Sequence, residues 1–213
     1  DQACDTLLSN LDTKPLGDPK LIKFTTGRRR KQWYKNVVAV GLSSGFLEPL
    51  ESTSIHLIQS AIVRLIQLFP HNGFAPSLET EYNKQSELEF EQIRDFLVLH
   101  YTVNERTDSA FFNDMRNITL PDSLAHKIAL FKESGNLLRE QNDLFLESSW
   151  LQVLYGQGIT PKDYHGLVNS VPEVQLNQML TRLLEIKKEP IAKLPTHDEY
   201  INGRVAKYKR AMS

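Results

Sequence analysis

The chain has 213 residues, 40% of them hydrophobic, and its 25 basic and 26 acidic residues give a formal net charge of −1. This composition supports a globular protein of one or two domains, and it lacks the basic excess that binds nucleic acid or an anionic membrane. A single cysteine excludes an internal disulfide and a cysteine zinc site, and no apolar run approaches the roughly 20 residues of a membrane helix. We therefore expect a cytoplasmic protein that is not inserted in a membrane.

Short apolar stretches near the N-terminus predict two strands. Residues 5–12 form only a weak helical pattern, after which residues 21–24 predict one strand and residues 37–40 a second, more buried one. Because two strands alone form a poor sheet, the sheet predicted by this part of the chain is incomplete.

Two long helices are predicted next, over residues 52–69 and 77–103. The apolar positions of the first recur at three- and four-residue steps: Ile55, Ile58, Ile62, Leu65, Ile66 and Phe69. Pro70 ends this helix. The second is expected to bury Tyr82, Phe90, Ile93, Leu97 and Tyr101. Its acidic positions are expected to stay largely in water: Glu79, Glu81, Glu87, Glu89 and Glu91.

The rest of the chain predicts shorter helices, at residues 109–116, 121–134, 144–155, 161–169, 172–188 and 196–208. Pro121, Pro161 and Pro172 lie where first-turn prolines are favoured. The last three-quarters of the chain therefore predict a helical subdomain.

The segment from Gly41 to Ile58 joins the second strand to the first long helix and has the layout of a cofactor loop. It is rich in small residues, carries two acids and a proline, and is longer than an ordinary connection. Ser52, Thr53 and Ser54 stand at the helix start, where unpaired backbone N–H groups attract anions.

The run FLEPLEST at residues 46–53 resembles the second flavin-contacting motif of flavin-dependent tryptophan halogenases. Further matches lie on both sides of it: Gly27-Arg28-Arg29, Trp33, Asn36, Arg94-Asp95-Phe96 and Gly156-Gln157-Gly158. Members of that family are more than twice as long and open with a Rossmann-type unit, whose G-x-G-x-x-G pattern is not met here because Pro161 stands in place of the third glycine. The resemblance implies that this chain is a C-terminal fragment.

The implied fold is α+β and mainly α, with a helical subdomain packed on a remnant of a flavoprotein sheet of the FAD/NAD(P)-binding, monooxygenase-like type. Residues 1–50 are expected to be the end of the FAD-binding domain, and residues 51–213 a helical subdomain on the substrate side. The fragment alone is expected to bind FAD weakly or not at all and to be inactive.

Glu51 is the predicted catalytic acid. The matching glutamate of tryptophan halogenases borders the reaction chamber, assists halogenation and contributes to substrate binding, either by polarising the oxidant or by removing the ring proton. The alternative from the residues alone is an acid that complements the dipole of the following helix.

The resemblance gives the neighbouring residues roles in holding the cofactor and the halide. Thr53 and Ser54 match the halide-binding positions, although Ser54 replaces the glycine of well-characterised members. Gly41, Leu42 and Ile55 match positions beside the isoalloxazine ring. The alternatives are a Ser/Thr helix cap, a tight turn and ordinary core packing.

Phe145 and Trp150 lie in a segment that corresponds to the family's indole-binding aromatics, and either ring can stack on a substrate or simply fill helical core. No histidine is spaced with other ligands as a metal site requires, so His56, His100 and the other histidines are predicted to be structural.

The resemblance implies FAD reduced by a separate flavin reductase, chloride or bromide, and an indole-type or related aromatic substrate. The family's essential lysine lies on the nucleotide-binding part and matches no residue here. A homodimer is left open. The alternatives are a flavin monooxygenase without halide chemistry, which Ser54 keeps open, and a non-catalytic helical binding or assembly module.

Overall fold

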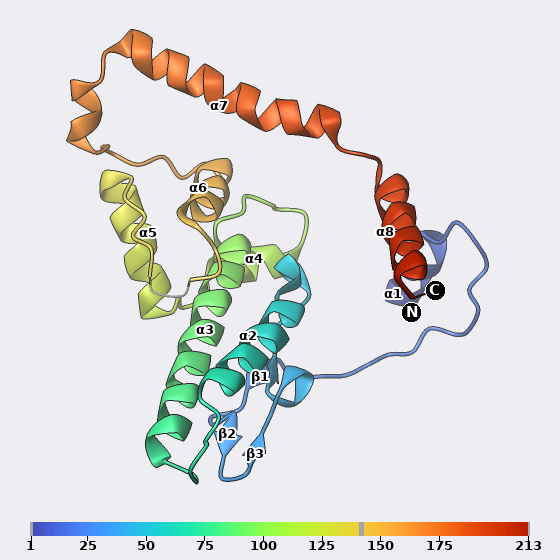
Figure 1. Cartoon of the computed structure of the whole chain (residues 1–213). Helices are drawn as coiled ribbons and strands as arrows, with labels where there is room; N and C mark the ends of the chain where they lie inside the picture. The colour runs from blue at the N-terminus through green and yellow to red at the C-terminus, as the bar shows by residue number, and fades with distance from the viewer. Residues whose placement is uncertain (1, 141–142, 213) are drawn as a thin grey trace. The chain divides into compact units, whose positions relative to one another are not determined.

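A computed structural model describes residues 2–140 and 143–212 of the chain. The chain divides into two compact units, the first made of residues 1–132 and 137–160 and the second of residues 133–136 and 161–213. The predicted boundary at residues 50 and 51 falls inside unit 1 and stays a prediction about a larger flavoprotein architecture. Most of the described residues are helical and the strands are short, which confirms the predicted fold class (Figure 1).

The helices are α1 (Gln2–Ser9), α2 (Thr53–Gln67), α3 (Pro76–Thr102), α4 (Ala110–Arg116), α5 (Asp122–Ser134), α6 (Glu147–Gly156), α7 (Glu173–Lys193) and α8 (His197–Met212). The strands are β1 (Gly27–Arg28), β2 (Trp33–Tyr34), β3 (Val37–Val38) and β4 (Gly45–Phe46). Three short 3₁₀ turns complete the elements: η1 (Gly41–Ser43), η2 (Leu50–Ser52) and η3 (Gly166–Ser170).

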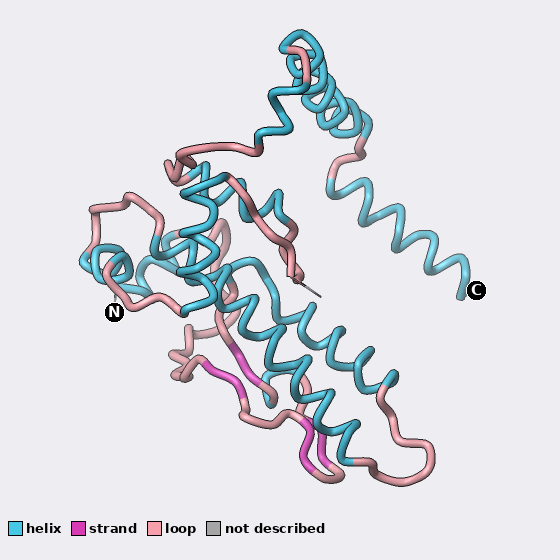
Figure 2. Tube along the Cα trace, turned by 90° about the vertical axis from the view of Figure 1, so that its left-hand side faces the viewer, coloured by secondary structure: helices cyan, strands magenta, loops and turns pink. Residues whose placement is uncertain are grey.

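The strands form two separate antiparallel pairs. β1 pairs with β4, with Gly27 opposite Phe46, and β2 pairs with β3, with Trp33 opposite Val38. The side chain of Asn83 on α3 holds the second pair, because its Oδ1 accepts from Trp33 N at 2.9 Å while its Nδ2 donates to Trp33 O at 2.8 Å. Figure 2 shows both pairs beside the α2–α3 hairpin.

Two predictions about strands were wrong. Residues 21–24 are irregular and their side chains are mainly exposed, because no strand among the described residues pairs with their backbone. Residues 37–40 form only the two-residue strand β3, and Val37 is exposed rather than buried, since no layer covers that face of the hairpin among the described residues.

α3 is the central element of unit 1. Pro76 fits its first turn, where the missing N–H has no intrahelical partner in any case. Farther along, one face contributes Phe96 and Leu99 to a cluster with α5 and α6, and another contributes Phe90, Ile93 and Leu97 to a cluster with Leu57 of α2. The predicted burial of α3 is confirmed except at Tyr101, which is only partly buried.

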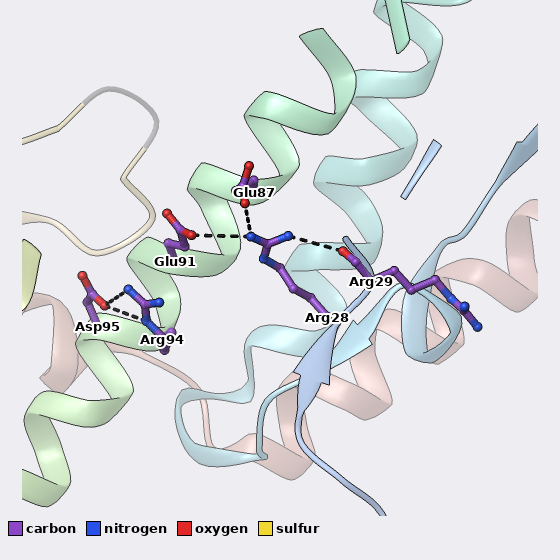
Figure 3. A network of polar contacts seen from close by, with 6 residues as sticks. All are labelled: Arg28, Arg29, Glu87, Glu91, Arg94 and Asp95. Atoms are coloured by element: carbon purple, nitrogen blue, oxygen red, sulfur yellow. Dashed lines mark hydrogen bonds and ion pairs between the residues drawn. The ribbon is translucent and has the colours of Figure 1, made fainter. Parts of the chain in front are cut away.

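Ion pairs connect β1 to α3 (Figure 3). Arg28 contacts the carboxylate of Glu87 and, at 3.5 Å, that of Glu91, one turn farther along the same helix. Lys31 pairs with Glu79 at 3.1 Å. The basic cluster at residues 28–31 is therefore neutralised in part by the acidic face of α3.

Gly45 lies where β4 approaches its neighbours too closely for any side chain. A Cβ atom built at this position would lie 2.8 Å from Gly27 O, 2.8 Å from Phe90 Cε1 and 2.9 Å from Arg28 Cα. Two of these three atoms belong to the backbone, so the strand pair must shift to relieve the overlap.

We expect Gly45→Ala to lower the free energy of unfolding by about 1–3 kcal/mol, as overpacking does. Urea unfolding followed by circular dichroism measures the change. Gly17→Ala is the matched control, because a Cβ at Gly17 meets nothing within 4 Å. An equal effect of the two substitutions would contradict the steric explanation.

Unit 2 contains η3, α7 and α8, and its described residues have exposed or partly exposed side chains. The helix predicted at residues 161–169 is wrong, because only the 3₁₀ turn η3 forms there and His165 accepts from Leu167 N at its start. α7 continues beyond the predicted end at residue 188 and accommodates Pro190 in its last turns.

Candidate functional site

The connection between β4 and α2 contains a strained turn. Glu51 has φ 62° and ψ 2°, and Ser52 has φ 53° and ψ 35°, so two successive residues with side chains adopt left-handed backbone conformations. Such conformations cost on the order of 1–3 kcal/mol each and persist only where surrounding contacts enforce them. Within the turn, Ser52 N donates to Pro49 O at 2.9 Å.

The last turn of α3 supplies contacts that hold this connection. His100 Nε2 lies 3.3 Å from Glu51 Oε1, and the hydroxyl of Tyr101 donates to Glu48 Oε2 at 2.9 Å. Two neighbouring residues of one helix thus engage the two acids of the loop. The carboxyl group of Glu51 remains accessible, with 38% of its side chain exposed.

Burial is the main cause that raises the pKa of Tyr101, and its hydrogen bond to the carboxylate of Glu48 raises it further. Tyr101 therefore keeps its phenol proton at neutral pH and acts as a hydrogen-bond donor. This bond satisfies Glu48 Oε2 and makes Glu48 a structural acid, unlike the accessible Glu51.

The start of α2 was predicted to bind halide, with a Ser/Thr side-chain cap as the alternative. Ser52 occupies the N-cap position, but its side chain makes no capping hydrogen bond. Thr53 is buried, and Ser54 lies inside the helix rather than in a left-handed conformation. A glycine at position 54 would therefore relieve no backbone strain.

The residues predicted to contact the flavin present apolar surface to solvent. Leu42 and Ile55 are 75% and 76% exposed, so the alternative that they are core residues does not describe this chain. Gly41 adopts φ +68°, a left-handed conformation that favours glycine, and a Cβ there would lie 3.5 Å from Ile58 Cγ1. Exposed aliphatic side chains such as Leu42 and Ile55 fit the edge of a planar aromatic cofactor.

A cavity of about 650 Å³ adjoins this surface. Leu42 lines it together with Phe24 and Phe46, and Arg28 and Arg29 contribute its charged wall. Residues from segment 22–25, which precedes β1, and residues 42–46 therefore line the same cavity, although 15 or more residues separate them in sequence.

The apolar stripe that predicts α2 does not face the core. Its exposed members are Ile55, Ile58, Ile62, Ile66 and Phe69. The buried face of α2 carries instead Thr53, Leu57, Ala61 and Arg64. Periodicity identified the helix correctly, but the face that packs against α3 is the more polar one.

Arg64 and Glu89 form a buried ion pair between α2 and α3. Arg64 Nη2 donates to Glu89 Oε2 at 2.7 Å, Arg64 Nη1 donates to Ser86 Oγ at 2.8 Å, and His56 Nε2 lies 3.1 Å from Glu89 Oε1. The prediction that Glu89 stays in water was wrong. Its side chain is buried between the helices because it forms an ion pair with Arg64 there.

Phe145 and Trp150 lie in the packed interior of unit 1. Trp150 is 3% exposed, and Phe145 stacks on Phe96 with ring centroids 3.9 Å apart. The ammonium group of Lys127 lies 4.2 Å from the centroid of a Trp150 ring. This packing favours the alternative that both rings fill helical core, and substrate binding by them stays a prediction.

Asp143 stands next to Phe145 and is also buried. Its Oδ1 accepts from Phe145 N at 3.2 Å, and its Oδ2 lies 3.6 Å from Lys127 Nζ. Burial raises the pKa of Asp143, while Lys127 and the backbone hydrogen bond oppose that rise. This acid orders the entry to α6 and is distant in sequence from the loop of Glu51.

The structure therefore places Gly41 beside Ile58 of α2 and Leu42 at the cavity, whereas Phe145 and Trp150 pack in the core. Sequence reasoning missed His100 as a partner of Glu51, because 49 positions separate the two residues. Within residues 2–140 and 143–212, no helix is long and apolar enough to cross a membrane, and no cluster of three or more His, Cys, Asp or Glu side chains can hold a metal.

Comparison with known proteins identifies the family of the chain. The family model described as tryptophan halogenase matches residues 1–173. Xcc4156, a flavin-dependent halogenase from Xanthomonas campestris, is 43% identical with a TM-score of 0.86, over 94% of this chain and 41% of its own. BrvH, a flavin-dependent halogenase from Brevundimonas sp. BAL3, is 40% identical with a TM-score of 0.85, over 95% of this chain and 41% of its own.

Among curated relatives, the tryptophan 6-halogenase SttH of Streptomyces toxytricini is 38% identical over 141 residues, which are 64% of this chain and 27% of that protein. The tryptophan 7-halogenase RebH of Lentzea aerocolonigenes is 26% identical over 93% of this chain and 40% of its own length. The chain thus spans less than half the length of these relatives.

Proposed function

Since the chain belongs to the tryptophan halogenase family, we propose that it forms the C-terminal part of a flavin-dependent halogenase acting on an indole-type or related aromatic substrate. The observation that carries the proposal is the accessible carboxyl group of Glu51, held on a strained turn beside exposed apolar surface. Strain of this kind concentrates at active sites.

Gly41, Leu42 and Ile55 would contact the isoalloxazine ring of FAD. The fit rests on the two exposed aliphatic side chains and on the left-handed backbone of Gly41. Reduced FAD from a separate flavin reductase would supply hypohalous acid to this site when oxygen and halide are present. The exposed stripe of α2 would be covered by the flavoprotein portion that the relatives carry and this chain does not span.

Thr53 and Ser54 would hold chloride or bromide through backbone N–H groups at the start of α2. The helix dipole favours an anion there, and the absence of a side-chain cap from Ser52 supports this assignment. Glu51 would act on the aromatic substrate as the acid or base of the substitution. The single cysteine fits a cytoplasmic location.

Phe145 and Trp150 would influence the substrate site mainly through the residues that they pack against. Both rings pack on Phe96, so they would shape the site through that residue, and partly buried Phe145 is the better candidate for direct contact. We assign no residue of this chain to the role of the family's essential lysine.

Product analysis of the full-length protein tests the proposal. With a flavin reductase, FAD, bromide and indole, we expect mass spectrometry to detect brominated indole. An oxygenated product without bromine would instead identify a monooxygenase. Unchanged indole while reduced flavin is supplied would favour a binding or assembly module.

A further inference from the structure

The two ring nitrogens of His100 have different partners, and these fix where its protons lie. Nδ1 is 2.8 Å from the backbone oxygen of Phe96, and Nε2 is 3.3 Å from Glu51 Oε1. A carbonyl oxygen only accepts hydrogen bonds, so Nδ1 must carry a proton. In a neutral imidazole Nε2 is then bare and can only accept.

An ionised carboxylate also only accepts, so a neutral His100 and an ionised Glu51 would face each other as two acceptors. The contact is therefore favourable only when one proton lies between Nε2 and Oε1. Either the ring is an imidazolium that donates to the carboxylate, or Glu51 is a carboxylic acid that donates to the ring.

We propose that His100 is the positioning residue for Glu51, holding Oε1 through this one shared proton and leaving Oε2 directed at the reacting substrate. The inference rests on the proposed function and deepens it. Among the described residues, the contacts of Glu51 give Oε2 no partner, so one oxygen is anchored and the other is available.

The anchor itself is rigid. The His100 ring meets the Phe96 ring edge to face, with centroids 4.8 Å apart. Phe96 is 2% exposed and contacts both Phe145 and Trp150, at centroid distances of 3.9 and 4.9 Å. The aromatic core of unit 1 therefore holds the ring that contacts Glu51.

The other acid of the loop is held separately. Glu48 Oε2 accepts from the hydroxyl of Tyr101, so the neighbouring residues His100 and Tyr101 each contact one of the two acids.

During substitution, a ring carbon of the substrate bonds to the halogen of hypohalous acid while the O–X bond breaks and its electron pair leaves on oxygen as hydroxide. The C–H bond at that carbon then breaks, and its electrons restore aromaticity. The proton transfers to Glu51 Oε2 and finally converts the hydroxide to water. His100 keeps Oε2 in line for this transfer and is neither oxidised nor reduced.

Two substitutions of His100 separate positioning from general packing. In His100→Asn the amide can still reach Phe96 O but not Glu51, whereas His100→Gln extends a donor to the former Nε2 position. We expect His100→Asn to lower kcat for halogenation about tenfold with the KM of the aromatic substrate changed less than twofold, and His100→Gln to stay within about threefold of the wild type. Equal kcat values for His100→Asn and wild type, or equal losses in the two variants, would overturn the proposal.

A spectroscopic measurement tests the proton directly and does not depend on turnover. In the full-length protein labelled with ¹⁵N-histidine, we expect the Nδ1 of His100 to be protonated and its Nε2 signal to move when Glu51 is replaced by Gln. A neutral ring with its proton on Nε2, or an Nε2 signal that ignores Glu51→Gln, would overturn the proposal. If wild-type protein gives no halogenated product while these signals appear as expected, the proposed function fails and the pairing stands.

Discussion

Glu51→Gln is expected to lower the rate of product halogenation by at least about 100-fold while the reoxidation of reduced flavin continues. General acid–base groups typically contribute 10²–10⁴-fold, and the amide is not basic enough to accept the ring proton. Glutamine has nearly the same volume as glutamate, so the substitution adds no steric conflict at the strained backbone of residue 51. Halogenated product is measured by mass spectrometry and flavin oxidation by absorbance.

Glu133→Gln is the matched control. Glu133 lies at the end of α5 with 64% of its side chain exposed, and it forms an ion pair with the exposed Lys162. We expect unchanged halogenation in this variant. If Glu51→Gln and Glu133→Gln gave equal rates, Glu51 would have no part in the chemistry, and the accessible carboxyl group would be explained by the helix dipole alone.

The elements of this fold were largely predictable because helical periodicity and helix-ending residues are local signals. The spacing of Ile55, Ile58 and Ile62 located α2, and the apolar residues of α3 located its buried face. Short strands were harder, since residues 21–24 have strand composition but no partner among the described residues. A strand depends on a neighbour that its own sequence does not encode.

The candidate site was predictable only in part. A loop motif carried Glu51, but no local pattern indicates that His100 and Tyr101 reach back to its two acids across about 50 residues. The buried face of α2 could not be predicted from the sequence either. Apolar side chains are usually buried and arginine is usually exposed, so the pattern points to the wrong face. Both expectations fail here since Arg64 finds Glu89 on the packed side.

The Arg64–Glu89 pair is expected to be the most sensitive polar contact between α2 and α3. Arg64→Met leaves Glu89 in a site where only 10% of its side chain is exposed, with partly exposed His56 as its remaining partner. Removing one member of a buried pair destabilises by about 3–5 kcal/mol, mainly because the other charge stays buried without compensation. Urea unfolding followed by the helical circular dichroism signal measures the loss.

A double substitution shows whether the stability lost in Arg64→Met comes from the uncompensated charge of Glu89. Arg64→Met combined with Glu89→Leu removes both charges, and we expect it to regain most of the stability lost in Arg64→Met alone, because apolar groups of similar volume often replace a buried pair without net cost. Arg182→Met is the exposed control, since Arg182 pairs with Glu185 while 63% and 56% of the two side chains remain exposed. It should change stability by less than about 1 kcal/mol. A loss in Arg182→Met as large as that in Arg64→Met, or a double variant no more stable than Arg64→Met, would show that burial of the pair is not what makes it important.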